Sequence, residues 1–324
     1  MISFRNCTGI IEKELHNLLL DNEPKELYEP IRYILSIGGK RIRPALVIMG
    51  CNLFSDNIEA AVNPAIAIEM FHNFTLLHDD IMDNAVVRRN KPTVHEKWNK
   101  NIALLSGDAM LIKAYEFISK SDPSILVPVL EVFNKTSVEV CEGQQYDMNF
   151  EHRQSVLVDE YLKMIELKTA VLIGASLKIG AITGKAKNED ANNLYEFGKN
   201  LGLAFQLQDD LLDVYANPET FGKDNGGDIV SNKKTYLLIT ALNLAQGAVR
   251  QDLTEWLQMK EFKKEVKIKA VTKIFDNLRI EALTREKADE YFQRAFISLD
   301  KIPVDENRKT FLKEFAVKLM GRNK

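Results

Sequence analysis

Basic charge is in short supply in this sequence. Its 324 residues include 43 lysines and arginines against 46 aspartates and glutamates, which gives a formal net charge of −3 at pH 7. Proteins that bind nucleic acid in general draw most of their affinity from a basic surface, so this balance excludes that class. An anionic substrate would have to be held by a local cluster of cations instead.

Cysteine and long apolar runs are scarce as well. Cys7, Cys51 and Cys141 form no CxxC pair and lie at no zinc-ligand spacing from a histidine, which predicts reduced thiols in the core of a cytoplasmic protein. The N-terminal stretch MISFRNCTGIIEKEL has no apolar signal core, and no apolar run approaches the roughly 20 residues of a membrane span. We therefore expect no signal peptide and no transmembrane segment.

Glycine and proline number only 16 and 9, and strand-like alternation is hard to find. Helical periodicity dominates instead, and apolar residues make up 45% of the chain, enough for a large core. No linker rich in Ser, Gly or Pro divides the sequence. We expect an all-α fold, a large helical bundle in one domain over residues 1–324, with helices near 8–20, 25–36, 44–54, 64–83, 101–119, 124–149, 159–183, 189–215, 232–246, 263–277, 280–299 and 304–320.

One of these expected helices ends in an aspartate cluster, Asp79, Asp80 and Asp83, after the largely apolar run FHNFTLL. Asp79 and Asp83 share a helix face because they are four residues apart, and Asp80 lies about 100° around. Carboxylates crowded beside an apolar stretch are costly unless cations compensate them. Mg²⁺ suits such oxygen ligands, although one cluster alone is equally compatible with a solvated helix end.

A second cluster repeats the same spacing. Asp209, Asp210 and Asp213 follow the apolar stretch GLAFQLQ, and a loop containing lysine comes next, as a loop containing arginine follows the first cluster. Two such clusters on separate helices are hard to explain as surface decoration. Together they predict a site for several Mg²⁺ ions.

Cations accompany both clusters. The stretch GGKRIRP places Lys40, Arg41 and Arg43 in a glycine-containing turn before a helix, a combination suited to an anion. A basic loop by itself is more often merely solvated, and a lysine inside an apolar stripe can extend its amine to the surface. The remaining candidate groups are Arg88, Arg89, Lys168, Thr169, Lys223 and Lys233.

No motif supplies a protein nucleophile. The sequence has no GxSxG elbow, no HExxH and no GxxxxGK[ST] loop. Chemistry on substrates rich in phosphate, with metal ions neutralising a leaving diphosphate, therefore fits the inventory best.

These residues resemble the trans-isoprenyl diphosphate synthases, or polyprenyl synthetase family. The similar pieces occur in the family's order from about residue 36 to 240, and their combination is far more specific than any one motif. They are GGKRIRP (38–44), FHNFTLLHDDIMD (71–83), RRNKPTVH (88–95), GDAML (107–111), EGQQYDM (142–148), KTA (168–170), FQLQDDLLD (205–213), FGKDNGGDI (221–229) and NKKTY (232–236). The C-terminal 80 or so residues carry no motif of this kind.

The resemblance implies the isoprenoid synthase fold, with both aspartate motifs facing each other across a central cavity. It implies about three Mg²⁺ per active site when substrate is bound. Asp79, Asp83 and Asp209 would be the metal ligands, supported by Asp80 and Asp213, and Asp210 would be a further catalytic residue. The family forms homodimers, so a homodimer is expected here.

The resemblance also implies the substrates and the reaction. The allylic diphosphate would be held by Arg88, Lys168, Lys223 and Lys233, and isopentenyl diphosphate by Lys40, Arg43, His72 and Arg89. Thr169 and Gln206 would line the reacting centre. The allylic diphosphate ionises, the isopentenyl double bond attacks, and the departing diphosphate is the expected proton acceptor.

Product length would be set by the residues just before the first aspartate motif. Phe74 lies five residues before Asp79, Thr75 four before and Phe71 eight before, with no insertion inside DDIMD. This pattern resembles short-chain enzymes that make geranylgeranyl diphosphate, with a farnesyl or longer product as the alternative. Phe74 could equally be an ordinary core phenylalanine.

Two other functions share part of the pattern. A class I terpene cyclase also ionises an allylic diphosphate, but it takes no isopentenyl diphosphate and does not need GGKRIRP. A regulatory prenyltransferase subunit generally loses one aspartate cluster, and both are intact here. A purely structural bundle is the remaining alternative.

Overall fold

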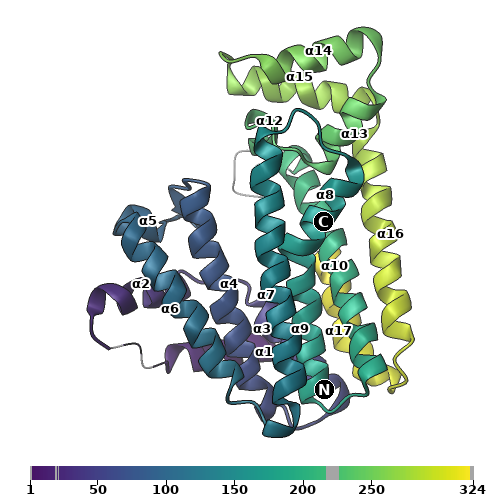
Figure 1. Cartoon of the computed structure of the whole chain (residues 1–324). Coiled ribbons are helices and arrows are strands. Elements are labelled where there is room, and N and C mark those ends of the chain that lie inside the picture. Colours follow the sequence, from purple (N-terminus) through teal and green to yellow (C-terminus); the bar gives the residue numbers. More distant parts are fainter. Residues whose placement is uncertain (1, 19, 21, 217–225, 322–324) are drawn as a thin grey trace. The chain divides into compact units, whose positions relative to one another are not determined.

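Helices make up almost all of the computed structural model (Figure 1), which describes every residue except 1, 19, 21, 217–225 and 322–324. Its described strands are one short hairpin, β1 (Val87–Arg88) and β2 (Lys91–Pro92). The predicted all-α fold is confirmed. The helices are α1 (Phe4–His16), α2 (Lys25–Ser36), α3 (Ile42–Phe54), η1 (Glu59–Ala61), α4 (Val62–Met82), α5 (Val94–Lys97), α6 (Lys100–Ile118), α7 (Pro123–His152), α8 (Val158–Ile165), η2 (Glu166–Ala170), α9 (Val171–Thr183), α10 (Asn188–Tyr215), α12 (Gly227–Val230), α13 (Tyr236–Leu244), α14 (Gly247–Gln258), α15 (Lys264–Asn277), α16 (Ile280–Asp300) and α17 (Glu306–Met320).

The chain folds into two compact units, each assembled from three separate stretches. The first unit contains Met1–Asn134, Ala175–Tyr195 and Ile302–Leu312, and the second contains the rest. The boundary falls inside the helices α7, α9, α10 and α17. A single domain over residues 1–324 stays a prediction.

In the first unit, α3 is buried along most of its length. Ten of its 13 residues are buried, so it is apolar all round rather than amphipathic, as expected of a core helix. It touches α9 at backbone distance: a Cβ added at Gly50 would lie 2.6 Å from the carbonyl oxygen of Leu177, and one at Gly180 would lie 2.1 Å from that of Val47. These two glycines are therefore required by close helix packing.

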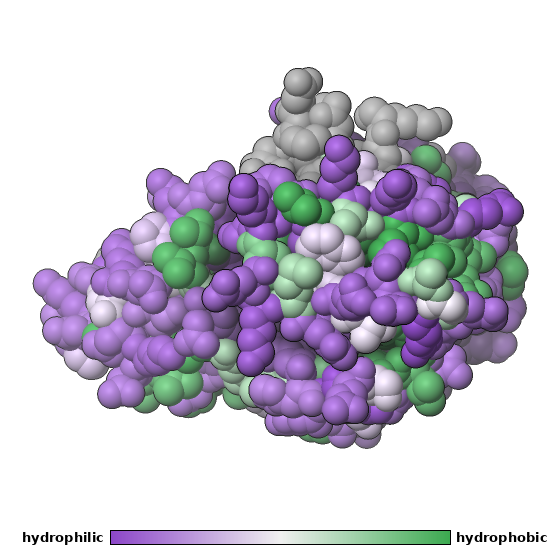
Figure 2. Space-filling view, turned by 90° about the horizontal axis from the view of Figure 1, so that it is seen from above, coloured by the Kyte–Doolittle hydropathy of each residue, from purple (hydrophilic) through white to green (hydrophobic). Residues whose placement is uncertain are grey.

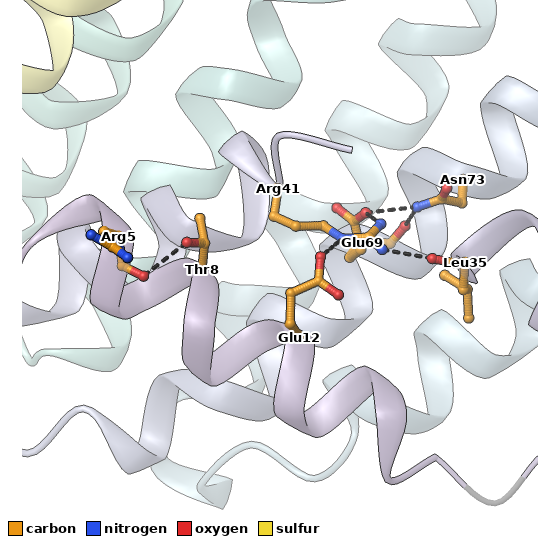
Figure 3. Close-up of polar contacts among 7 residues, drawn as sticks. All are labelled: Arg5, Thr8, Glu12, Leu35, Arg41, Glu69 and Asn73. Atoms are coloured by element: carbon orange, nitrogen blue, oxygen red, sulfur yellow. Dashed lines mark hydrogen bonds and ion pairs between the residues drawn. The ribbon is translucent and has the colours of Figure 1, made fainter. Parts of the chain in front are cut away.

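The start of α3 is fixed by a buried arginine (Figure 3). Arg41, in the left-handed conformation with φ of 47°, is 4% exposed. Its guanidinium donates to Glu12 at 2.7 Å, to Glu69 at 2.5 Å and to the carbonyl of Leu35 at 2.6 Å. Glu69 is also buried and accepts a second hydrogen bond from Asn73 at 2.9 Å. The network ties α1, α2, α3 and α4 together next to Lys40 and to the first turn of α3, which contains Arg43.

The second unit contains two apolar clusters. One joins α8, α10, α13 and α16 around residues such as Tyr161, Leu207 and Ile239. The other joins the end of α10 to α12, α13, α14 and α15 around Leu211, Leu253 and Phe275. α14 and α15 lie side by side and shield this second cluster (Figure 1).

Most expected helices are observed. The short helices η1, α5 and α12 were not expected, and three longer segments also differ from the expectation. The helix expected at 8–20 begins and ends four residues earlier, because Ser3 caps it by accepting the N–H of Asn6. The helix expected over 159–183 contains five residues of π-helix, Glu166–Ala170. The helix Gly247–Gln258 was not expected at all, although Val249, Leu253 and Trp256 give it an apolar face.

Polar side chains cover most of the face seen in Figure 2, and apolar ones gather in separate patches. None of the described helices is both long and apolar enough to cross a lipid bilayer. All three cysteines are free, and Cys7 and Cys51 are buried as expected, but Cys141 is exposed on α7, so the prediction of a core thiol was wrong for that residue.

The Arg41 network yields a stability prediction. Arg41→Met should lower the free energy of unfolding by about 3–5 kcal/mol, because it leaves the Glu69 carboxylate buried without its cation. Arg5→Met makes the same chemical change at an exposed position on α1 and should change stability by less than about 0.5 kcal/mol. Urea denaturation of both variants measures the difference. Equal stabilities for the two variants would contradict a structural role for Arg41.

Candidate active site

A tight hairpin presents the two arginines that follow the first aspartate motif. The expected loop at 84–92 contains β1 and β2, joined by Arg89 and Asn90 with φ of 52° and 61°. Two consecutive positive φ angles are the signature of a type I′ hairpin turn. Arg88 folds back on α4 and grips Asp80, with Nε 2.9 Å from both carboxylate oxygens and Nη2 2.7 Å from Oδ1.

Within the first aspartate motif the three side chains are in different environments. Asp80 is 2% exposed, Asp79 is half-buried and Asp83 is exposed. The 100° step of the helix places Asp80 on the inner face, and its carboxylate there serves to orient Arg88. Asp79 and Asp83 share the outer face, as predicted from their spacing.

Four arginines crowd around His72 in the first unit. Nη1 of Arg43 donates to Nε2 of His72 at 3.2 Å, which assigns the ring proton to Nδ1 since arginine has no acceptor. Burial lowers the pKa of His72 well below its usual value, and the charges of Arg43, Arg89, Arg88 and Arg41 lower it further. The histidine is therefore neutral. The arrangement is a cluster with an excess of positive charge.

The pKa of Arg43 reflects the same excess of positive charge. Burial lowers its pKa to about 10, with Glu69 opposing and Arg89 adding to the decrease. Nε of Arg43 is buried and has no hydrogen-bond partner among the described residues. A buried donor left unpaired is costly, so it points to a ligand that completes the site. Arg89 packs on Gly39, where an added Cβ would lie 2.7 Å from its guanidinium.

The residues expected to set product length form part of an aromatic cluster. The Phe74 ring lies 5.7 Å from that of Phe71 and 4.7 Å from that of His78, and Phe71 lies 5.4 Å from Phe133. Phe71 is 1% exposed, whereas Phe74 is half-buried. The hydroxyl of Thr75 donates to the carbonyl of His72 at 2.8 Å, within the helix.

In the second unit, Lys168 and Thr169 lie in the π-helical segment Glu166–Ala170. Nζ of Lys168 donates to Asp147 on α7 at 2.6 Å. The segment is packed between two glycines. A Cβ at Gly143 would lie 2.2 Å from the backbone nitrogen of Lys168, and one at Gly202 would lie 2.7 Å from Cα of Ala170. π-helical turns of this kind are frequent at functional sites.

A hydrogen-bond chain connects this segment to the second aspartate motif. The hydroxyl of Thr169 donates to Oε1 of Gln206 at 3.3 Å, and Nε2 of Gln206 donates to Asp210 at 3.1 Å. Tyr161 donates its hydroxyl to the other oxygen of Asp210. Burial raises the pKa of Asp210 to about 7, although these two hydrogen bonds favour its charged form. Asp210 is thus the inward-facing member of its motif, as Asp80 is of the first.

The outer members, Asp209 and Asp213, lie near a further carboxylate. Oδ2 of Asp213 accepts the N–H of Asp228 at 2.9 Å, at the start of α12. Burial raises the pKa of Asp228 to about 6, Lys233 opposes the rise, and Asp213, Asp209 and Asp147 add to it. Negative charge therefore exceeds positive charge here, the reverse of the cluster around His72. Lys223, a predicted substrate contact, lies outside the described residues.

The polyprenyl synthetase family matches residues 24–275. The chain belongs to this family. It is 42% identical to a geranylgeranyl diphosphate synthase of Methanosarcina mazei over 239 residues, covering 73% of this chain and 74% of the relative. It is 36% identical to a geranylgeranyl pyrophosphate synthase of Geoglobus acetivorans, with 97% and 96% covered. A crystal structure of a geranylgeranyl pyrophosphate synthase is similar along both entire chains, with a TM-score of 0.95 and 42% identity.

Family membership confirms the prediction of a trans-prenyltransferase with the isoprenoid synthase fold. It does not assign roles to individual residues, so those roles stay predictions. The two aspartate motifs of this polyprenyl synthetase belong to different units, and their facing each other across a central cavity stays a prediction too.

The donor sets of this polyprenyl synthetase fit Mg²⁺. Within the described part of the chain, no three histidine, cysteine, aspartate or glutamate side chains form a closed metal cage. Mg²⁺ usually keeps several waters and binds one or two carboxylates together with substrate phosphates. The pairs Asp79 with Asp83, and Asp209 with Asp213, suit such partial ligand sets, and the carboxylate crowding around Asp228 would be relieved by a cation.

Sequence reasoning missed three residues of the second unit. Asp147 lies in EGQQYDM and Asp228 in FGKDNGGDI, so the motifs pointed to their neighbourhoods without giving them roles. Tyr161 lies in no recognised motif, and only the folded chain brings it to Asp210.

The π-helical segment yields a prediction with a matched control. Gly143→Ala should push the Lys168 backbone away, lowering stability by about 1–3 kcal/mol and lowering kcat by about ten- to a hundred-fold through displacement of Lys168. Gly9→Ala, in the open middle of α1 where an added Cβ meets nothing within 4 Å, should instead stabilise by roughly 0.5–1 kcal/mol with unchanged kcat. Thermal unfolding and steady-state kinetics measure both. A Gly143→Ala enzyme with wild-type kcat would show that this packing does not position Lys168.

Proposed function

We propose that this polyprenyl synthetase is a Mg²⁺-dependent geranylgeranyl diphosphate synthase. It condenses isopentenyl diphosphate with an allylic diphosphate (dimethylallyl, geranyl or farnesyl) to a short all-trans product. The names of its relatives from Methanosarcina mazei and Geoglobus acetivorans support this product. A farnesyl or longer product is the alternative within the same reaction.

The observation that carries the proposal is the presence of two unbalanced charge clusters. One is the cationic cluster of Arg43, Arg88 and Arg89 around neutral His72, with its unpaired Arg43 donor. The other is the carboxylate cluster of Asp209, Asp213 and Asp228, in which the charges of Asp209 and Asp213 help to raise the pKa of Asp228. Diphosphates would neutralise the first and Mg²⁺ the second.

The site residues divide into metal ligands, orienting residues and substrate ligands. Asp79, Asp83 and Asp209 would hold about three Mg²⁺, whose charge would supply neutralisation of the leaving diphosphate. Asp80 orients Arg88, and Asp210 orients Gln206. Lys40, Arg43, His72 and Arg89 bind isopentenyl diphosphate, while Arg88, Lys168, Lys223 and Lys233 bind the allylic diphosphate.

The reaction needs no protein nucleophile. The allylic C–O bond breaks and its electron pair leaves with the diphosphate. The isopentenyl double bond then forms the new C–C bond to the allylic carbon, and a proton is lost from the adjacent carbon to the departed diphosphate. Gln206 and the hydroxyl of Thr169, fixed by their mutual hydrogen bond, stabilise the developing positive charge through their oxygen dipoles.

Phe74 is proposed as the floor for the growing chain, with Thr75 beside it and Phe71 beneath. Its half-buried ring lies on the fully buried ring of Phe71. Removing the Phe74 side chain would therefore lower the floor only to a second aromatic layer, formed by Phe71 and Phe133. The increase in product length would be limited by that layer.

The enzyme is further proposed to act in the cytoplasm as a homodimer. Exposed apolar residues recur along one face of α6, at Leu104, Ile112 and Tyr115, with Leu105 alongside. An apolar stripe of this kind on a described helix is typical of a protein interface.

Chromatography of dephosphorylated products tests the proposal. Purified protein is given Mg²⁺, isopentenyl diphosphate and each of the three allylic starters. Its main product should be the C20 diphosphate, which is detected as the C20 alcohol after dephosphorylation. Phe74→Ala should give longer products, because the methyl side chain leaves space above Phe71. Leu244→Ala, a truncation of an exposed side chain, is the control and should leave the product length unchanged.

The outcomes separate the alternatives. Consumption of the allylic substrate without isopentenyl diphosphate would indicate a cyclase, and no turnover by the protein alone would indicate a regulatory subunit. A C15 main product would replace the geranylgeranyl assignment with a farnesyl one. An active, folded Phe74→Ala enzyme with the wild-type product would remove Phe74 as the floor.

A further inference from the structure

Lys267 on α15 is a fully buried lysine that no sequence motif identifies. Its exposed fraction is 0%. Nζ donates to Oδ1 of Asn232 at 2.7 Å and approaches the carbonyl oxygen of Val230 at 3.4 Å. The ring of Phe262 covers the ammonium at 4.2 Å from its centroid. Among the described residues, no carboxylate forms an ion pair with this lysine.

A buried ammonium held only by neutral groups is costly, and burial lowers its pKa from the usual value. The amide oxygen, the carbonyl and the aromatic face must therefore be held in place for the charge to persist. All three partners come from segments that are close to Lys267 only in the folded chain or, for Phe262, just before α15. The two hydrogen-bonding partners, Val230 and Asn232, belong to the turn at residues 230–233, which we call the Asn232 turn.

Asn232 has a left-handed backbone, with φ of 55°. Its side-chain amide has one assignable orientation: Oδ1 faces Lys267, which can only donate, and Nδ2 donates to the carbonyl of Leu257 at 3.0 Å. The Asn232 side chain thus fastens the turn to the end of α14 and to α15 at once. Asparagine tolerates this backbone conformation better than most residues, but it is not free of strain there.

The next residue is Lys233, the proposed ligand of the allylic diphosphate. Its N–H donates to the carbonyl of Asp228 at 2.9 Å, and its carbonyl accepts the N–H of Thr235 at 2.8 Å. The direction in which Lys233 leaves the turn is consequently set by the left-handed residue that precedes it. Asp228, in the carboxylate cluster, is held by the same backbone.

We infer that Lys267 is a positioning residue for the reaction, which through Asn232 fixes the turn that aims Lys233 at the allylic diphosphate. The inference rests on the proposed function. It adds a buried residue from the second half of the chain, outside every family motif in the sequence, to the machinery of the active site. Lys267 itself touches no substrate.

Two variants test the inference from opposite ends. Lys267→Met keeps the length of the side chain and removes its charge and donors. Asn232→Gly keeps the left-handed backbone accessible and removes the acceptor. Each should lower kcat/KM for the allylic substrate by about ten-fold or more, as expected when a reacting group is misplaced by about 1 Å, and should change KM for isopentenyl diphosphate by less than about two-fold. Lys269→Met, an exposed lysine on the same helix, is the control and should match wild type.

A third arm separates positioning from a general loss of structure. Lys233→Ala should show the allylic defect by itself, and adding Lys267→Met to it should cause no further decrease, because both act through one group. A multiplicative loss in the double variant would overturn the inference, as would wild-type kinetics for Asn232→Gly. Equal loss for both substrates in Asn232→Gly would also overturn it. If Lys267→Met does not fold, Asn232→Gly and the Asn232→Gly/Lys233→Ala pair give the same test. Wild-type turnover and Lys233→Ala by itself report on the proposed function separately.

Discussion

The structure depends on how like charges are kept together without unfolding the helices that carry them. Each charged motif resolves this in a similar way: one member turns inward and is held by side chains of the same unit, and the aspartates beside Asp80 and Asp210 are more exposed. Arg41 turns inward to Glu69, Asp80 to Arg88, and Asp210 to Tyr161 and Gln206. For the two aspartate motifs, the geometric cause is the 100° step of the helix, which separates the second aspartate from the pair at i and i+4.

This division makes the inner residues the supports of the outer ones. Arg41 holds the turn before α3, so the flanking Lys40 and Arg43 can be presented together. The bidentate contact of Asp80 orients Arg88, and Asp147 restrains Lys168 within the π-helical segment. The Asn232 turn repeats the principle with neutral groups around Lys267. In each of these contacts a polar group that is costly to bury is compensated by a hydrogen-bonding partner, and it lies beside a side chain that we propose to bind substrate.

The fold class could be predicted from the sequence, because long stretches with helical apolar periodicity and few glycines favour helices over β-strands. The outer aspartates were also predictable, since their spacing alone places them on one face. The inward roles were not. Arg41 looked like a third cation of an anion site, and its burial depends on Glu12 and Glu69, which are distant in sequence.

The π-helical segment also could not be predicted from the sequence. Nothing in ELKTA departs from an α-helical pattern, and the space that the segment occupies is left open by Gly143 and Gly202 on other helices. Tyr161 and Lys267 escaped notice for a related reason: a buried polar residue has no local signature, because its partners are supplied by tertiary structure. The helix α14 was missed because its apolar face is narrow and its remaining residues are polar.

The central claim is that neighbouring aspartates of one motif have separate tasks, support inside and ligand binding outside. The most direct test is the free energy of unfolding, measured with kcat, for Asp80→Asn and Asp83→Asn, the same substitution three residues apart. The account predicts that Asp80→Asn loses about 1–3 kcal/mol of stability, because Arg88 loses the negative charge and one of the two acceptor oxygens of its buried partner, and an amide donor faces it instead. It predicts that Asp83→Asn is as stable as wild type, or slightly more so, while its kcat falls by about a hundred-fold or more, since its carboxylate acts only with Mg²⁺ and substrate bound. Equal loss of stability in the two variants, or a wild-type kcat for Asp83→Asn in saturating Mg²⁺, would contradict it.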